Sequence, residues 1–238
     1  MKSHLYGSLP AKVIWFTRRF GLAELILLPI RKVFAPIVRP FIKPGTFHFN
    51  GCDFPYFYHS HNVTWSNERC VEIALASDYL RQYLGRSILE VGNVMSRYCP
   101  VSHQVLDKYE RADSVINADI VEFNPYKKYD LILSVSTFEH IGFDDDADES
   151  SANKIIQAIA SCRRLLATGG RLVLTVPLGY NPDLDDLIRS GKLGESRASF
   201  LKRTTRCEWI EVPRATALES RYGSPYPYGN AVMIAEFE

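Results

Sequence analysis

The sequence has little of what marks several common classes of protein. Its 238 residues include only five cysteines, which are scattered and form no C-x-x-C pair. This pattern argues against a zinc module or a disulfide framework and favours a reducing compartment. No uncharged apolar run approaches the roughly 18–20 residues that a membrane-spanning helix needs. We therefore expect a cytoplasmic protein without a transmembrane helix.

The chain also lacks the signature of a nucleic-acid-binding protein. Its formal net charge is only +1, and residues 45–238 carry −6 without an aromatic and basic stripe. We therefore expect no nucleic-acid partner. His48, His59 and His61 are the densest set of potential metal ligands, but no cysteine or carboxylate lies at ligand spacing from them. We therefore expect no metal site.

Residues 1–44 form a basic and apolar segment with a net charge of +7. Ile26, Ile30, Val33 and Ile37 recur at steps of four, three and four, which predicts a helix with one apolar face. The prolines of this segment are expected to break it into short helical pieces. Those prolines are Pro29, Pro36 and Pro40, and the cations are Lys2, Lys12, Arg18, Arg19, Arg31, Lys32, Arg39 and Lys43, opposed by Glu24 alone.

Two interpretations of this N-terminal arm remain open. In the first, its apolar face lies in the acyl boundary of a membrane at the cytoplasmic side and its cations bind anionic headgroups. In the second, the arm packs on the following domain or on a second subunit. Trp15 and the Arg18–Arg19 pair slightly favour the membrane surface.

From residue 68 onwards, expected helices and strands alternate. Such alternation predicts an α/β fold with a doubly wound, mainly parallel sheet, which binds ligands beyond the carboxyl ends of its strands. Helices are predicted over 68–84 and 151–167, the second ending at Gly169–Gly170. Strands are predicted over 87–91, 103–109, 113–120, 129–136 and 171–177, with late strands in 207–213 and 230–238. The last strand is expected to form a hairpin with its neighbour.

The stretch SILEVGNVMSRY, residues 87–98, has the form of a strand followed by a cofactor loop. Such loops usually carry two or three glycines, but here only Gly92 is present, with Val94 and Ser96 at the other places. The absence of G-x-G-x-x-G counts against a dehydrogenase.

An ordered set of segments resembles the class I S-adenosylmethionine-dependent methyltransferase family. The segments are LEVGN (89–93), Asp107, Asp119, YDLILSVSTFEHIG (129–142) and LLATGGRLVLTVPLG (165–179). The resemblance covers residues 68–238 and implies a seven-stranded Rossmann-like sheet with a reversed last strand. It also implies S-adenosylmethionine as cofactor, and it is nearest to bacterial-type methyltransferases that modify surface polysaccharides or lipids.

The resemblance also implies roles for residues at the strand ends. Glu90 orders the loop or contacts the methionine ammonium, and Gly92 gives the cofactor room to approach the backbone. Asp107 accepts hydrogen bonds from the ribose hydroxyls, and Asp119, with the backbone of Ile120, holds the adenine amino group. Because Gly92 and Asp107 are close in sequence, the first helix must be short. Asn93 and Ser134 complete the expected cofactor contacts.

Other residues are expected to cover the cofactor pocket, to act as the general base or to bind the substrate. Residues 45–67 are expected to lid the cofactor, with Trp65 and the following Arg69 contacting its sulfonium and carboxylate. His140 is the candidate general base; the alternative is a structural histidine. Tyr180, Asn181 and Arg206 are the candidate substrate contacts.

The sequence thus predicts a methyltransferase that acts on a hydroxyl or amine of a small molecule or of a glycan- or lipid-linked acceptor. The alternative is a non-catalytic cofactor-binding or scaffold protein on the same fold, in which the changes at Val94 and Ser96 have abolished catalysis.

Overall fold

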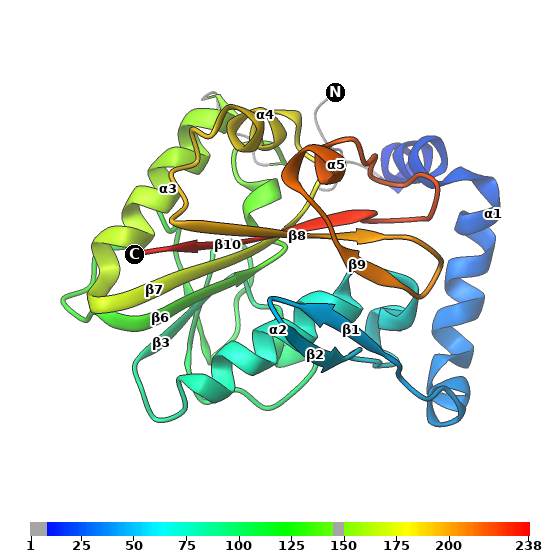
Figure 1. Ribbon diagram of the computed structural model, residues 1–238, viewed down its shortest axis with the longest axis horizontal. Coiled ribbons are helices and arrows are strands. Elements are labelled where there is room, and N and C mark those ends of the chain that lie inside the picture. The colour runs from blue at the N-terminus through cyan, green and yellow to red at the C-terminus, as the bar shows by residue number, and fades with distance from the viewer. Residues whose placement is uncertain (1–8, 145–149) are drawn as a thin grey trace.

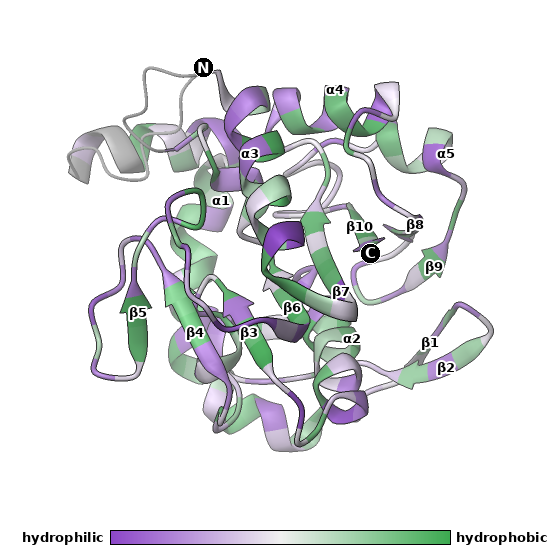
Figure 2. Ribbon diagram, turned by 90° about the vertical axis from the view of Figure 1, so that its left-hand side faces the viewer, coloured by the Kyte–Doolittle hydropathy of each residue, from purple (hydrophilic) through white to green (hydrophobic). Residues whose placement is uncertain are grey.

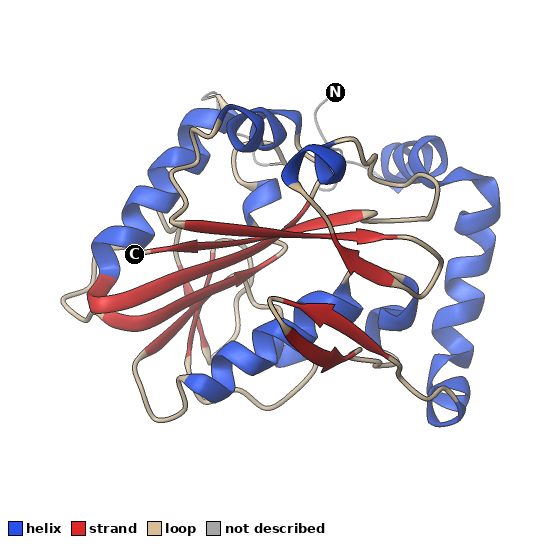
Figure 3. Ribbon diagram, in the orientation of Figure 1, coloured by secondary structure: helices blue, strands red, loops and turns tan. Residues whose placement is uncertain are grey.

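An eight-stranded sheet with helices on both faces forms the centre of the molecule (Figures 1 and 3). The computed structural model describes residues 9–144 and 150–238. The strand order is β5-β4-β3-β6-β7-β10-β8-β9. The strands are β3 (Ile88–Val91), β4 (Gln104–Asp107), β5 (Val115–Asn117), β6 (Tyr129–Val135), β7 (Leu166–Pro177), β8 (Arg197–Arg203), β9 (Trp209–Glu211) and β10 (Ala231–Phe237).

The strand directions confirm the predicted fold class. Strands β5, β4, β3, β6 and β7 are parallel to one another, whereas β10 runs antiparallel to both β7 and β8. The last strand is therefore reversed, as expected. The short edge strand β9 is an eighth strand beyond the seven expected. It pairs with β8, so the expected hairpin between the last strand and the 207–213 strand is wrong.

The central strands are buried on both faces, which explains their nearly continuous apolar sequences. Side chains alternate between the two faces, so Ile132 of β6 packs in one hydrophobic cluster while Leu131 and Leu133 pack in the other. Strand β6 and the second half of β7 accordingly are mostly hydrophobic in Figure 2. Every residue of β10 is buried, because this strand lies between β7 and β8.

The helices divide between the two faces of the sheet (Figure 1). Helices α3 (Ser151–Leu165), α4 (Pro182–Ser190) and α5 (Arg214–Leu218) cover one face. Helix α2 (Arg69–Gln82) covers the other, together with a hairpin of β1 (Thr46–Phe49) and β2 (Cys52–Pro55). The 3-10 turn η2 (His61–Ser66) joins this hairpin to α2.

Helix α3 ends earlier than predicted. Its last residue is Leu165, and Leu166 already has extended backbone and pairs with Tyr129 at the start of β7. The Gly169–Gly170 pair therefore lies inside β7, next to a register shift against β6, and does not stop the helix. Pairing with β6 overrides the local helix-ending signal.

The N-terminal arm forms helix α1 (Leu9–Val38) and the 3-10 turn η1 (Arg39–Phe41). The predicted breaks at Pro29 and Pro36 are wrong, because both prolines lie inside the helix. The break falls at Gly21, whose φ of 84° and ψ of 162° are open essentially to glycine alone. A proline removes one hydrogen bond and kinks a helix, but the backbone at Gly21 leaves the helical region altogether. No helix among residues 9–144 and 150–238 is long and apolar enough to cross a membrane.

Candidate active site

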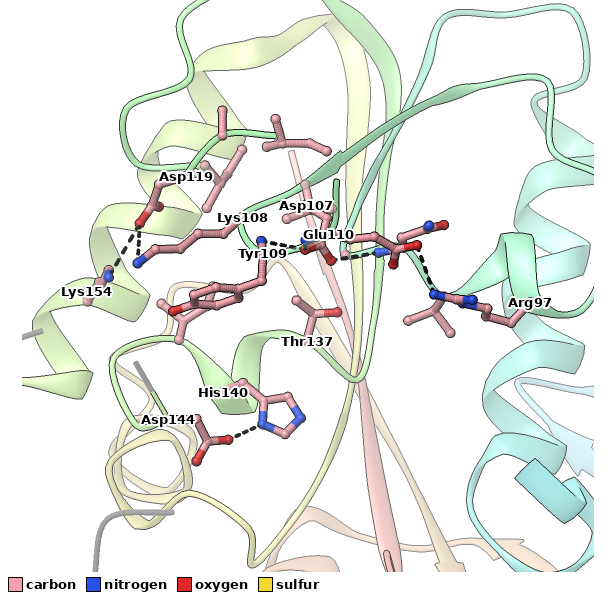
Figure 4. Close-up of a pocket in the computed structure, with 18 residues that line it drawn as sticks. Arg97, Asp107, Lys108, Tyr109, Glu110, Asp119, Thr137, His140, Asp144 and Lys154 are labelled. Atoms are coloured by element: carbon pink, nitrogen blue, oxygen red, sulfur yellow. Dashed lines mark hydrogen bonds and ion pairs between the residues drawn. The ribbon is translucent and has the colours of Figure 1, made fainter. Parts of the chain in front are cut away.

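A pocket opens at the carboxyl ends of the parallel strands (Figure 4). It has a volume of about 500 Å³ and is built from the loops that follow β3, β4, β5 and β6, together with one residue of α3. Its lining residues are Val91–Val94, Arg97, Leu106–Glu110, Ala118–Ile120, Thr137, His140, Ile141, Asp144 and Lys154. Six of the expected site residues thus meet in one place: Gly92, Asn93, Asp107, Asp119, Ile120 and His140.

Glu90 fixes the loop after β3 through hydrogen bonds with the loop backbone. Its Oε1 accepts hydrogen bonds from the backbone N–H groups of Val94 and Met95, both at 2.8 Å. Its Oε2 accepts from Nε2 of His103 at 2.8 Å. Glu90 is fully buried and does not line the pocket. Of its two expected roles, the contacts therefore favour loop ordering over direct contact with a cofactor.

The loop turns at Gly92 and enters the short 3-10 turn η3 (Met95–Arg97). This confirms that the first helix is short. Gly92 has a φ of 89°, and a Cβ built there would lie 2.1 Å from Oγ1 of Thr137. The room that glycine provides is therefore occupied by a side chain from the loop after β6, a contact that the sequence did not reveal.

Asp107 ties the first two loops of the pocket together. Its Oδ2 accepts from the N–H of Asn93 at 3.2 Å. Its Oδ1 accepts from the N–H groups of Tyr109 and Glu110, both at 2.8 Å. These bonds fix the carboxylate at the end of β4, facing the pocket (Figure 4).

Asp119 lies at the other end of the pocket, between two lysines (Figure 4). Its Oδ2 is 3.1 Å from Nζ of Lys108 and 3.5 Å from Nζ of Lys154. Burial alone would raise the pKa of Asp119, but the N–H of Val121 and the two ammonium groups outweigh it and lower the pKa below its ordinary value. Asp119 is therefore ionised at neutral pH.

His140 belongs to a bonded cluster at the floor of the pocket. Its Nδ1–H donates to Oδ2 of Asp144, which also accepts from the Tyr180 hydroxyl at 2.9 Å. The rings of His140 and Tyr180 meet edge to face with centroids 4.8 Å apart. Burial alone would lower the pKa of His140, but the carboxylates of Glu139 and Asp144 reverse this and raise it. Burial also raises the pKa of Glu139 to about 7.

Tyr180 and Asn181 lie beside the pocket without lining it. Tyr180 reaches the site by donating a hydrogen bond to Asp144 and by packing its ring against His140. The Asn181 side chain caps α4 by accepting from the N–H of Asp183, and it donates to the Glu139 carbonyl and to Ser151 Oγ. Asn181 therefore holds α4 against the loop that carries His140.

The remaining expected site residues lie outside the pocket lining. Ser134 donates to the Val91 carbonyl beneath the first loop. Arg69 pairs with the buried Glu72 at 3.4 Å, and Trp65 packs on Tyr58. Arg206 is exposed, and its carbonyl accepts from the Arg203 guanidinium. None of residues 45–67 lines the pocket, so a lid made by this segment stays a prediction.

Several lining residues were missed at the sequence level: Arg97, Lys108, Tyr109, Glu110, Thr137, Asp144 and Lys154. Most of them lie within five positions of a recognised residue, so proximity along the chain was the available signal. Arg97 ends the SILEVGNVMSR stretch, and its Nη2 donates to Glu110 at 2.9 Å. Lys154 comes from α3 and could be placed only by the fold.

No family model and no curated protein matches the sequence. Among solved structures, the chain is similar to the N-methyltransferase NodS of Bradyrhizobium japonicum, bound to S-adenosyl-L-homocysteine. The two are 14% identical, with a TM-score of 0.38, over 68% of this chain and 83% of NodS. An S-adenosylmethionine-dependent methyltransferase from Clostridium acetobutylicum is 12% identical, with a TM-score of 0.36, over 68% of this chain and 88% of its own. The glycopeptide N-methyltransferase MtfA, bound to sinefungin, is 11% identical, with a TM-score of 0.35, over 70% of this chain and 93% of its own.

The contact between Gly92 and Thr137 predicts a large effect of Gly92→Ala. The strained backbone alone costs about 1–3 kcal/mol of unfolding free energy, and the overlap with Thr137 adds to this cost. Urea denaturation measures it, with Gly191→Ala as control, because Gly191 also has a positive φ but open space around it. Adding Thr137→Ala should recover part of the loss. Equal losses for the two glycine variants would contradict the proposed overlap.

The ion pair between His140 and Asp144 predicts a pKa change in Asp144→Asn. Loss of the carboxylate should lower the pKa of His140, measured by NMR titration of its ring protons. The raised pKa also means that the interactions of His140 with Glu139 and Asp144 stabilise the fold below about pH 6.5, a contribution lost as the pH rises through the folded-state value. Asp186→Asn, at an exposed site on α4, is the control. An unchanged His140 titration in Asp144→Asn would be evidence against the pair.

Proposed function

We propose that this chain is an S-adenosylmethionine-dependent methyltransferase acting on a hydroxyl or amine of a small molecule or of a glycan- or lipid-linked acceptor. One observation carries the proposal: a single pocket brings together a carboxylate at the end of β4, one after β5 and a histidine–aspartate pair after β6. Ligands of doubly wound sheets bind at this edge. The pocket volume of about 500 Å³ suits a nucleoside-sized cofactor.

The lining residues fit the parts of the proposed cofactor in order along the pocket. Asp107, fixed by three backbone N–H groups, faces the pocket where two ribose hydroxyls can donate to it. Asp119 and the backbone of Ile120 would hold the adenine amino group. Arg97 lies at the opposite side of the pocket from Asp119, where its guanidinium can bind a carboxylate (Figure 4).

S-adenosylmethionine, when bound, supplies an electrophilic methyl group on a sulfonium. His140 would remove the proton from the acceptor hydroxyl or amine. Asp144 fixes the ring through Nδ1, which leaves Nε2 as the basic nitrogen. Because the pKa of His140 is raised, its neutral form, and with it this role, grows as the pH rises.

The second candidate function is a non-catalytic binding or scaffold protein on the same fold. The close packing of Thr137 against Gly92 favours it, because that side chain occupies space beside the first loop. Binding of the cofactor and turnover of its methyl group separate the two candidates.

Calorimetric titration with S-adenosylmethionine and S-adenosylhomocysteine tests the proposal. Both should bind, and Asp107→Ala should weaken binding about tenfold or more, because hydrogen bonds to a carboxylate contribute about 1.5–3 kcal/mol. Asp186→Ala, an exposed aspartate on α4, should bind as the wild type does. No binding of either compound by the wild type would reject the cofactor. Binding without methyl transfer in an acceptor screen would favour the scaffold.

We also propose that helix α1 binds an anionic membrane surface. Its polarity is inverted: Glu24 is buried and pairs with Arg31, while the expected apolar face is open to solvent. The members of that face are Ile26 (59% exposed), Ile30 (47%), Val33 (71%) and Ile37 (63%). A large exposed apolar patch usually marks an interaction site, and the exposed cations Arg18, Lys32 and Lys43 complement anionic headgroups.

Flotation with phosphatidylglycerol vesicles tests this membrane binding. The triple variant Ile26→Glu, Val33→Glu, Ile37→Glu should lose flotation, because each apolar side chain withdrawn from lipid costs about 1.5–3 kcal/mol. Leu84→Glu, at a position 81% exposed beyond α2, is the matched control and should float. If the triple variant floats like the wild type, α1 does not bind the membrane. If the wild type is a dimer without lipid and the triple variant is a monomer, the partner of α1 is a second copy of the chain.

A further inference from the structure

A second pocket lies where the first half of α1 meets the loops after β7 and α5. It has a volume of about 390 Å³. Its residues, called here the arginine pocket, are Trp15, Arg18, Arg19, Gly179, Ser220, Arg221 and Tyr222. Among these described lining residues are three arginines and no carboxylate. The arrangement therefore presents concentrated positive charge in a concave site.

Arg19 is held rigidly in this pocket. Its Nη2 donates to the Gly179 carbonyl at 3.1 Å. Its guanidinium carbon lies 4.8 Å from the ring centroid of Tyr222, 5.1 Å from that of Tyr180 and 5.8 Å from that of Trp15. Aromatic faces position a guanidinium without neutralising its charge. Asp185 lies nearby and accepts a hydrogen bond from the N–H of Gly179 at 3.0 Å. Its single negative charge is smaller than the positive charge of the three arginines.

Two buried polar atoms of the arginine pocket have no partner. Within the described residues, Nε of Arg19 and Oγ of Ser220 are both enclosed and make no hydrogen bond. Native structures rarely leave such groups unpaired. The exposed guanidinium groups of Arg18 and Arg221 also make no ion pair with any described side chain. Donors and positive charge thus remain unused at the same place.

Tyr180 connects the arginine pocket to the candidate active site. Its ring lies against Arg19 on one side and meets His140 at 4.8 Å on another. Its hydroxyl donates to Asp144, which lines the larger pocket. One aromatic ring therefore separates Arg19 from the proposed base.

We propose that the arginine pocket binds a phosphate group of the methyl acceptor, so that the acceptor's reactive hydroxyl or amine lies toward His140. That the bound phosphate compound is a methyl acceptor rests on the proposed methyltransferase function. The phosphate site itself does not depend on that function. Three guanidinium groups match a phosphate monoester better than a carboxylate, because the phosphate has three terminal oxygens and up to two charges, whereas the carboxylate has two oxygens and one charge. The neighbouring rings of Trp15 and Tyr222 suit a ring attached to the phosphate.

Titration of the full chain with phenyl phosphate, benzoate and benzyl alcohol tests the proposal. Trp15 fluorescence and calorimetry are the readouts. Phenyl phosphate should bind with a Kd of about 1 mM or lower, benzoate more weakly, and neutral benzyl alcohol not at all. Stronger binding of dihexanoyl phosphatidic acid than of phenyl phosphate would identify the acceptor as a lipid, and the reverse would identify a soluble phosphate ester. Equal binding of phenyl phosphate and benzyl alcohol would overturn the proposal.

Arginine variants locate the site. Arg18→Gln with Arg221→Gln changes two exposed side chains and should weaken phenyl phosphate binding about tenfold or more. Arg81→Gln with Arg189→Gln, two exposed arginines on α2 and α4, is the matched control and should leave it unchanged. Equal weakening in both double variants would mean general charge attraction and overturn the site. Asp107→Ala should weaken cofactor binding but leave phenyl phosphate binding unchanged, which separates failure of the cofactor proposal from failure of this one.

Discussion

The buried carboxylate of Glu90 is the interaction on which the candidate active site depends. A loop with one glycine has little freedom to shape itself, and here its geometry is imposed by hydrogen bonds from Val94 and Met95 to one carboxylate oxygen. His103 fixes the other oxygen at 2.8 Å. A buried carboxylate without such donors would be strongly destabilising. Strand β3, the first loop and the segment before β4 are therefore one bonded unit, and Asp107 extends it to the next strand end through Asn93.

Tyr180 links the residues around His140, as Glu90 links those of the first loop. It is buried, it comes directly after the loop that ends β7, and it contacts His140, Arg19 and Tyr222. Its hydroxyl shares Asp144 with His140, so any shift of Tyr180 changes the environment of the proposed base. The phosphate group proposed to bind beside Arg19 would therefore lie near the same aromatic ring that contacts the histidine. Tyr180 therefore contacts residues of both pockets.

The sequence predicted the fold class and six of the residues that line the candidate pocket, because the signals for both are local. Parallel strands place their carboxyl ends at one edge, so Gly92, Asp107, Asp119 and His140 could be brought together from strand positions alone. Contacts between distant segments could not be predicted in the same way. The approach of Thr137 to Gly92, the end of α3 at Leu165 and the outward face of α1 each depend on packing that no periodicity encodes. Arg206 was expected at the substrate, but the fold puts Arg19, from the opposite end of the chain, beside Tyr180.

The two halves of α1 differ in what they contact, and the backbone at Gly21 separates them. Before Gly21, Phe20 packs on Tyr222 and Tyr228, and Arg19 completes the arginine pocket. After Gly21, the helix buries Glu24 and Ala35 and exposes its large apolar side chains. A helix that only covered the domain would bury those side chains inward, because burial of each one contributes about 1.5–3 kcal/mol. This outward apolar face is the observation behind the proposed membrane binding, and the arginine pocket lies on the other side of Gly21 along the same helix.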